Sequence, residues 1–135
     1  MTVLIALIDD DLSYQFISKR NLMAAKHEPR LLQFYDGLEA INYFEVHQEE
    51  FGELPDIVFL DINMPYLDGW QFLDRLAELN LIKKGIIIYM VTSSLSPLDI
   101  EKAAGYKVLA GYEVKPITKD KFNEIIEKTI NELEN

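Results

Sequence analysis

Short apolar segments alternate with amphipathic segments along the whole chain. Most of the apolar segments show little polar alternation, which is typical of parallel strands that are covered on both faces. The segments between them carry apolar residues three or four positions apart, which is typical of helices that pack one face against a sheet. The predicted strands are 3–8, 30–35, 56–60, 85–91 and 110–114, and the predicted helices are 12–26, 38–48, 70–79, 97–105 and 119–133.

Polar residues that favour helix starts stand before several of the predicted helices. Asp36 and Thr118 are predicted N-caps, because a short side chain with an oxygen can accept a hydrogen bond from the free N–H groups of the first turn. Ser96 and Asp99 have the spacing of a capping box, with Pro97 at the first helical position. These signals indicate where the preceding segments stop and the helices begin.

Strands that alternate with helices predict an α/β fold of the doubly wound (βα)₅ type, with one five-stranded parallel sheet and helices on both faces. No repeat, low-complexity segment or linker interrupts the pattern, so we expect residues 1–135 to form a single domain. In sheets of this kind, ligands and chemistry lie at the carboxyl ends of the strands. The residues at those ends are therefore the first candidates for function.

Four of the five predicted strands end in residues that can do chemistry. The first ends in Asp9-Asp10-Asp11, the third in Asp61, the fourth in Thr92-Ser93-Ser94 and the fifth in Lys115-Pro116. Folding does not require a carboxylate, a hydroxyl or an ammonium at the end of an apolar strand. Polar residues of different types at four such ends therefore favour a functional site.

The residue types indicate which chemistry this site would perform. Carboxylates that converge on one edge of a sheet repel each other, and a divalent cation relieves that repulsion. Because all the ligands are hard oxygens, they favour Mg²⁺, with Mn²⁺ as an alternative, over zinc. A carboxylate that the metal does not use up could attack phosphorus, and a lysine and a hydroxyl would then bind the phosphoryl oxygens.

Composition narrows the classes of partner. The chain of 135 residues has 13 Lys and Arg against 23 Asp and Glu, a net charge of -10, and no cysteine. Such an acidic domain repels phosphate backbones and anionic lipids, so we expect neither nucleic acid nor a membrane as a partner. The lack of cysteine fits a reducing compartment, and no targeting segment is recognisable, so we expect a cytoplasmic protein.

Five motifs together resemble the receiver domain of two-component response regulators. In chain order they are 9–11 after an apolar strand, 59–65 (Phe-Leu-Asp-Ile-Asn-Met-Pro), Asp68-Gly69, 91–93 (Val-Thr-Ser) and 111–116 (Gly-Tyr-Glu-Val-Lys-Pro). The resemblance implies a CheY-like, flavodoxin-like sheet with strand order 2-1-3-4-5. Because no output domain follows the last predicted helix, the chain resembles a stand-alone receiver.

The resemblance also implies a role for each matching residue. Asp61 would accept a phosphoryl group from a histidine kinase or a phosphotransfer protein, so the chain would be a phosphoacceptor rather than a turnover enzyme. The other implied roles are Mg²⁺ ligands at Asp9, Asp10, Asp61 and the main-chain carbonyl of Asn63, phosphoryl contacts at Lys115 and Thr92, a small residue for phosphoryl access at Ser93, a switch pair at Thr92 and Tyr112, and a cis peptide bond between Lys115 and Pro116.

Signalling without an output domain would pass through the surface. The predicted output face consists of the fourth helix, the fifth strand and the fifth helix, roughly 97–105, 109–114 and 119–133. It mixes lysines with acidic residues, which suits a reversible contact with a target protein or with a second copy of the chain. Two departures from the family pattern fall on this face: Glu113 stands where an aliphatic residue is usual, and 106–110 lacks the common Gly-Ala-Asp turn.

Each candidate residue taken alone also has a structural explanation. A single aspartate of 9–11 would suffice to cap a helix, the segment after Asp61 could be a plain turn, and Thr92 could merely end a strand. Lys115 before proline could lie in a solvated turn, and Tyr112 could be a packing residue. Only the ordered set of all of them favours phosphoryl chemistry.

A competing interpretation belongs to a different class. Asp9-x-Asp11 after a strand, followed by Thr92 and Lys115, also resembles a haloacid-dehalogenase-type phosphatase in which Asp9 would be the nucleophile and Asp11 the acid. That interpretation leaves Asp61 without a role and lacks an acidic pair at a strand end after the lysine. A flavin carrier would need a Ser/Thr/Gly-rich loop where this chain has aspartates, and a receiver that works without phosphorylation would not need the full residue set.

Overall fold

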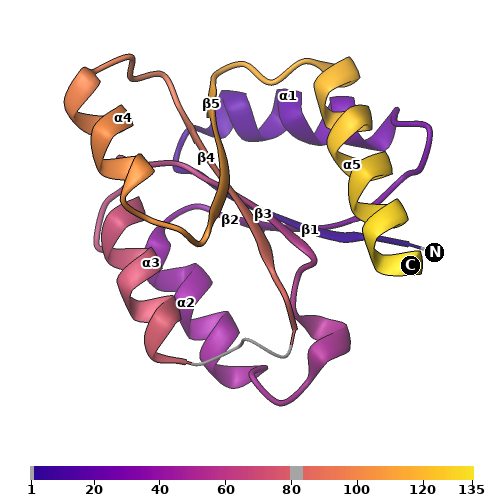
Figure 1. Cartoon of the computed structure of the whole chain (residues 1–135), viewed down its shortest axis with the longest axis horizontal. Helices are drawn as coiled ribbons and strands as arrows, with labels where there is room; N and C mark the ends of the chain where they lie inside the picture. Colours follow the sequence, from indigo (N-terminus) through magenta and orange to yellow (C-terminus); the bar gives the residue numbers. More distant parts are fainter. Residues whose placement is uncertain (1, 80–83) are drawn as a thin grey trace.

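The computed structural model describes residues 2–79 and 84–135, and its strands form one parallel sheet in the order β2-β1-β3-β4-β5 (Figure 1). The predicted (βα)₅ fold and its 2-1-3-4-5 order are thereby confirmed. The elements are β1 (Leu4–Ile8), α1 (Leu12–Met23), β2 (Arg30–Phe34), α2 (Gly37–Val46), a 3₁₀ turn (Phe51–Glu53), β3 (Ile57–Leu60), α3 (Gly69–Glu78), β4 (Ile87–Thr92), α4 (Pro97–Ala104), β5 (Leu109–Val114) and α5 (Lys119–Glu134).

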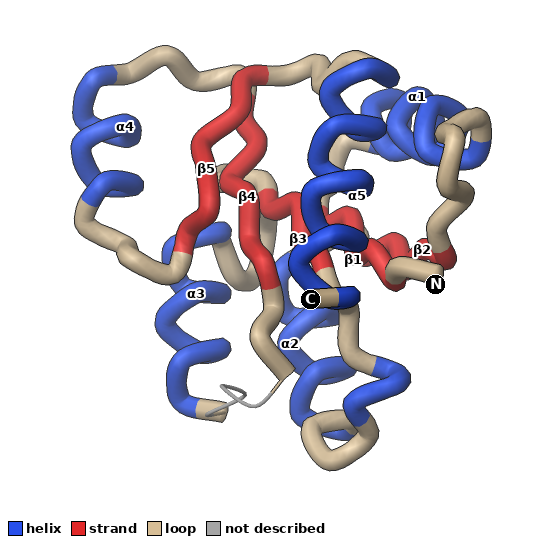
Figure 2. The backbone as a smooth tube through the Cα atoms, turned by 45° about the vertical axis from the view of Figure 1, so that its right-hand side comes forward, coloured by secondary structure: helices blue, strands red, loops and turns tan. Residues whose placement is uncertain are grey.

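The helices form two layers with the sheet between them. Helices α1 and α5 cover one face, and α2, α3 and α4 cover the other (Figures 1 and 2). Phe44 of α2 meets Phe72 of α3 with ring centroids 5.6 Å apart, and across the sheet Phe59 of β3 meets Phe122 of α5 at 5.2 Å. Because both layers bury apolar side chains, every residue of β1 and β3 is buried, which explains why these strands are continuously apolar.

Helix starts follow the predicted caps in two of three cases. The side chains of Asp36 and Thr118 each accept a hydrogen bond from the backbone N–H three residues later, so both predicted N-caps are confirmed. The helices are shorter than predicted at some ends: α1 stops at Met23 and α2 at Val46. Such differences of a few residues are common at helix ends, where the last turn frays.

The predicted capping box at the start of α4 is wrong. Ser96 is the N-cap by backbone conformation, but its side chain makes no capping hydrogen bond. Asp99 accepts a hydrogen bond from the Ser94 hydroxyl at 2.8 Å instead, and that hydroxyl oxygen also accepts from the Ser96 N–H at 3.2 Å. The loop between β4 and α4 therefore organises the helix start through Ser94.

Helix α1 packs against the sheet with a partly polar face. Its fully buried residues are Gln15, Ser18 and Leu22, whereas Phe16 and Ile17 are 68% and 50% exposed. The apolar residues that predicted this helix thus lie mostly on its outer side.

A buried glutamine explains that orientation. The Gln15 side-chain amide donates to the backbone carbonyls of Leu7, Asp9 and Phe34 at 3.1, 3.1 and 2.9 Å. These carbonyls lie at or just beyond the carboxyl ends of β1 and β2, and the Phe34 carbonyl also accepts from the Asp9 N–H. The first helix is therefore fixed to the sheet by hydrogen bonds, beside the edge where the candidate site lies.

The opposite, amino edge of the sheet contains an ion pair of its own. Asp56 precedes β3, and its carboxylate accepts from the Leu4 N–H and pairs with the Lys84 ammonium, each at 2.9 Å. One carboxylate here meets one ammonium and one N–H. Separately, no helix among the described residues is both long and apolar enough to cross a membrane.

Candidate functional site

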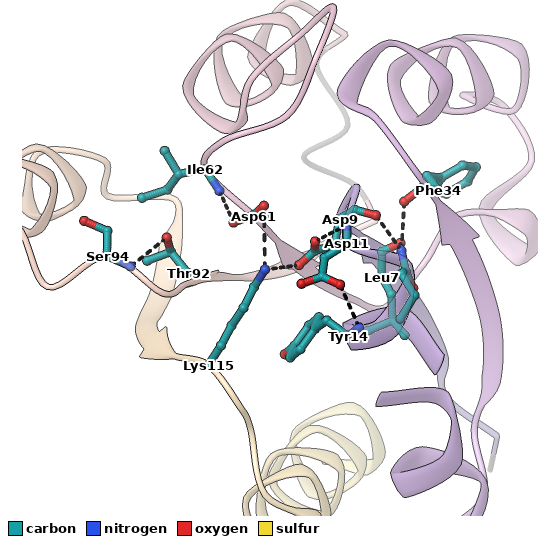
Figure 3. Close-up of polar contacts among 11 residues, drawn as sticks. Leu7, Asp9, Asp11, Tyr14, Phe34, Asp61, Ile62, Thr92, Ser94 and Lys115 are labelled. Carbon is teal, nitrogen blue, oxygen red and sulfur yellow. Dashed lines mark hydrogen bonds and ion pairs between the residues drawn. The ribbon is translucent and has the colours of Figure 1, made fainter. Parts of the chain in front are cut away.

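Asp9 lies one residue beyond β1 and is held there by the backbone. Its N–H donates to the Phe34 carbonyl at 3.0 Å, and its carboxylate accepts from the Asp11 N–H at 2.9 Å. The side chain is almost completely buried. The strand thus delivers a carboxylate to the carboxyl edge of the sheet in a fixed orientation (Figure 3).

Asp61 reaches the same edge from the neighbouring strand. Because β1 and β3 pair in parallel, the Asp61 N–H donates to the Ile8 carbonyl at 2.9 Å, and one carboxylate oxygen accepts from the Ile62 N–H at 2.9 Å. The residue is 6% exposed. Its second carboxylate oxygen faces the Lys115 ammonium at 3.7 Å (Figure 3).

Lys115 enters from the far side, one residue after β5. Its backbone N–H donates to the Thr92 carbonyl at 2.9 Å, which places the side chain over the edge of the sheet. The ammonium lies 2.6 Å from the second oxygen of Asp9. The peptide bond between Lys115 and Pro116 is cis.

The acidic residues outnumber the cation that faces them. Oxygens of Asp9, Asp10 and Asp61 lie within 4.8 Å of one another, and Lys115 is the ammonium that pairs with two of them. Burial, and then the charge of Asp9, raise the pKa of Asp61 to about 6 although Lys115 opposes the shift. Burial likewise raises the pKa of Asp9. The site therefore favours an added positive charge.

The donor set fits a hard divalent cation. Three carboxylates supply only oxygen, which matches Mg²⁺ or Mn²⁺ and not a zinc site of nitrogen and sulfur. Asn63, two residues after Asp61, is exposed, and among the described residues no hydrogen bond uses its main-chain carbonyl. The residues that the sequence singled out as metal ligands are therefore compatible with such an ion.

The hydroxyl residues lie at the end of β4. Thr92 is buried, and its hydroxyl oxygen accepts a hydrogen bond from the Ser94 N–H at 3.2 Å (Figure 3). Ser93 is exposed between them. Tyr112 of β5 is half-buried, and its hydroxyl donates to the Ser94 carbonyl at 3.0 Å. One loop thus connects Thr92, beside the acidic cluster, to Tyr112 on the outer strand.

Sequence comparison decides the family. Residues 5–127 match the response regulator receiver domain. The chain belongs to this family. The receiver family explains why four strand ends carry polar residues, and it confirms the resemblance inferred from the five motifs.

Individual relatives agree with the assignment. This receiver is 23% identical over 125 residues to the chemotaxis protein CheY of Bacillus subtilis, covering 93% of this chain and 96% of that protein. It superposes on a two-component response regulator from Cytophaga hutchinsonii with a TM-score of 0.85 and 28% identity, over 97% and 99% of the two chains. A Mn²⁺-bound form of the response regulator Rcp1 matches with a TM-score of 0.70 and 25% identity, over 91% and 88%.

The structure does not support the phosphatase alternative, because the aspartate that would act as its acid caps a helix instead. Asp11, which that alternative needs as an acid, is the N-cap of α1, and its carboxylate accepts from the Tyr14 N–H at 3.0 Å. Asp61, which that alternative leaves without a role, belongs to the acidic cluster with Asp9 and Asp10. The helix start thus accounts for one aspartate of the triplet, and the other two remain for the cluster.

One residue of the receiver site was not predicted from the sequence. The ring centroid of Tyr14, in the first turn of α1, lies 4.6 Å from the Lys115 ammonium. Its place in the first turn of the helix that follows β1 was the available signal, because that turn begins beside the strand end.

Proposed function

We propose that the receiver accepts a phosphoryl group on Asp61 from a histidine kinase or a phosphotransfer protein. The observation that carries the proposal is the buried Asp61 carboxylate, which shares the Lys115 ammonium with Asp9 and lies within 4.8 Å of oxygens of Asp9 and Asp10. One Asp61 oxygen would attack phosphorus, the bond from phosphorus to the donor's imidazole nitrogen would break, and the histidine would leave neutral or take up a proton from water. The chain would then be a phosphoacceptor and not a turnover enzyme.

Asp9, Asp10, Asp61 and the main-chain carbonyl of Asn63 would hold Mg²⁺, or Mn²⁺ in its place. When bound, the ion would neutralise charge on the carboxylates and on the transferred group. The excess of carboxylates over ammonium groups supports this, as does the raised pKa of Asp61. Asp9 and Asp10 would carry the ion while Asp61 keeps one oxygen for the attack.

Lys115, Thr92 and Ser93 would act on the phosphoryl group itself. The ammonium of Lys115 is already near Asp61 and would donate to a phosphoryl oxygen as charge develops there. The buried Thr92 hydroxyl would turn from the Ser94 N–H toward another oxygen. Ser93, small and exposed, would leave the approach open.

The signal would leave through the output face of α4, β5 and α5. Movement of Thr92 would disturb the loop to which the Tyr112 hydroxyl is bonded, so the two residues would switch together. A groove of about 350 Å³ between α4 and β5, lined in part by Ile100, Ala104 and Tyr112, offers a place for a cytoplasmic target protein. A second copy of the chain is the other expected partner, giving a homodimer on phosphorylation.

Labelled acetyl phosphate with Mg²⁺ tests the phosphoacceptor. We expect the wild-type protein to take label on Asp61, and Asp61→Asn to take none, because the amide keeps the shape but is no nucleophile. Asp56→Asn is the matched control, since it changes a half-buried aspartate that pairs with a lysine at the opposite edge and should label at the wild-type rate. Label on Asp9, or undiminished labelling of Asp61→Asn, would contradict the proposal.

Amide hydrogen exchange with and without beryllofluoride tests the output face. We expect the largest changes in exchange rate in the loops of the site. The next largest changes should be in α4, β5 and the start of α5. The Tyr112→Phe variant removes the hydrogen bond to Ser94 and should weaken the response in β5. Changes confined to α1 and α2, with the output face silent, would refute this part of the proposal.

A further inference from the structure

The Lys115 ammonium has an aromatic neighbour as well as carboxylate ones. It lies 2.6 Å from Asp9, 3.7 Å from Asp61 and 4.6 Å from the ring centroid of Tyr14. Figure 3 shows the Tyr14 ring beside the Lys115 side chain, on the side of α1. A cation at this distance from a ring centroid is attracted by the negative face of the ring.

We propose that Tyr14 is a positioning residue that holds the Lys115 ammonium at the phosphorylation site through its ring. The inference rests on the proposed function and adds a residue to it. A lysine side chain is flexible and strongly hydrated, so its ammonium needs fixed neighbours to stay in one place. Asp9 and Asp61 attract it from the sheet, and Tyr14 attracts it from α1.

An aromatic face suits this task better than another carboxylate. A carboxylate would occupy one of the three ammonium protons and would add negative charge where a phosphoryl group must bind. The ring attracts the cation as a whole, so the protons stay available for Asp61 and for phosphoryl oxygens. Tyr14 thus keeps the lysine within reach without competing for its hydrogen bonds.

The hydroxyl of Tyr14 does not account for the choice of residue. It is buried beside Ser18 and the backbone of Ile117, but it forms no well-aligned hydrogen bond among the described residues. Burial raises the pKa of Tyr14 to about 12, so the side chain stays a neutral phenol. The ring is therefore the part that matters, and a phenylalanine should replace it.

A double-mutant comparison separates positioning from packing, since Tyr14 also contacts the core beneath α1. Labelling by acetyl phosphate with Mg²⁺ would be measured for Tyr14→Phe and Tyr14→Leu, each with Lys115 present and with Lys115→Ala. We expect Tyr14→Phe to label within about twofold of wild type and Tyr14→Leu about fivefold to tenfold more slowly. With Lys115→Ala, the leucine should change the residual rate by less than about twofold.

Equal slowing by Tyr14→Leu in both backgrounds, or no slowing in either, would overturn the inference. Circular dichroism melts should show all variants folded.

A second measurement does not depend on phosphorylation. The ε-methylene protons of Lys115 next to a ring should resonate upfield, and Tyr14→Leu should move them downfield while Tyr14→Phe leaves them in place. If the Lys115 resonances do not shift in Tyr14→Leu, that result alone would overturn the inference. If the wild-type protein takes no label at all, the proposed function is wrong instead, and the resonance comparison still decides whether Tyr14 holds Lys115.

Discussion

The two edges of the sheet each place an aspartate that is at least half-buried beside a lysine, yet they differ in charge balance. At the amino edge, Asp56 has one ammonium and one N–H as partners, so its charge is matched. At the carboxyl edge, Asp9, Asp10 and Asp61 lie close together, and among the described residues Lys115 is the ammonium that pairs with Asp9 and Asp61. The first arrangement is complete within the protein, whereas the second calls for a further cation.

This difference separates an ion pair whose charges balance from one in which negative charge is in excess. Burying a charge is tolerated when partners satisfy it, and Asp56 meets that condition. The raised pKa of Asp61 shows that its edge does not meet it. A buried Asp–Lys pair is therefore no sign of function by itself, and the excess of like charge is the informative feature.

The largest expected effect is a pH dependence at the carboxyl edge. The folded pKa of Asp61, about 6, lies above its ordinary value of 3.8, so the folded state binds a proton that the unfolded state has lost between these pH values. Stability conferred by that proton is present at low pH and is lost as the pH rises through about 6. In EDTA, the free energy of unfolding should fall by about 3 kcal/mol over this range.

The variant Asp61→Asn isolates this contribution. It should flatten that part of the pH profile and should be more stable than the wild-type protein at pH 7. Urea unfolding at several pH values measures both. If the stability of Asp61→Asn depended on pH in the same way as that of the wild-type protein, Asp61 would not carry the excess charge that distinguishes the carboxyl edge from the amino edge.

Removing the charge-balanced aspartate, Asp56, should lower the free energy of unfolding, whereas Asp61→Asn should raise it at pH 7. Asp56→Ala leaves the Leu4 N–H without its acceptor and Lys84 without its counter-ion, both in a half-buried place. We expect a loss of about 2 kcal/mol in the free energy of unfolding. A stabilising or neutral effect at pH 7 would show that the amino edge also carries unfavourable charge.

Added Mg²⁺ should act at one edge only. At a free concentration ten times its dissociation constant, the ion should stabilise the wild-type protein by about 1.4 kcal/mol. Asp9→Asn should abolish most of that gain, and Asp56→Asn should keep it. Thermal melts with and without the metal measure the shift, and equal shifts in both variants would place the ion elsewhere.

The sequence predicted the fold because each core strand is continuously apolar and each strand end changes abruptly to polar residues. It also predicted which residues meet, since the carboxyl ends of parallel strands share one edge: Asp9, Asp61 and Lys115 do lie together. Their roles in phosphorylation stay predictions. Residue type and strand position were enough for this much.

Features that depend on a partner distant in the chain were not predictable. Gln15 is buried because the carbonyls of Leu7, Asp9 and Phe34, at or just beyond the ends of β1 and β2, accept from its amide, and no local pattern reveals that. Ser96 and Asp99 were predicted to form a capping box, but Asp99 accepts a hydrogen bond from the Ser94 hydroxyl instead. The contact of Tyr14 with Lys115 joins the first helix to the end of the last strand, and it required the tertiary structure.

The polar contact between α1 and the sheet, made by Gln15, has a thermodynamic consequence. Helix α1 buries few apolar side chains of its own, chiefly Leu22, because Phe16 and Ile17 face solvent and the Gln15 amide supplies much of its contact with the sheet. Its detachment would still uncover the apolar sheet residues beneath it. Heat-capacity change and denaturant dependence both scale with exposed surface. Opening of α1 should therefore depend less on urea and on temperature than opening of α5, which buries Phe122, Ile125 and Ile126 and should open only with the whole domain.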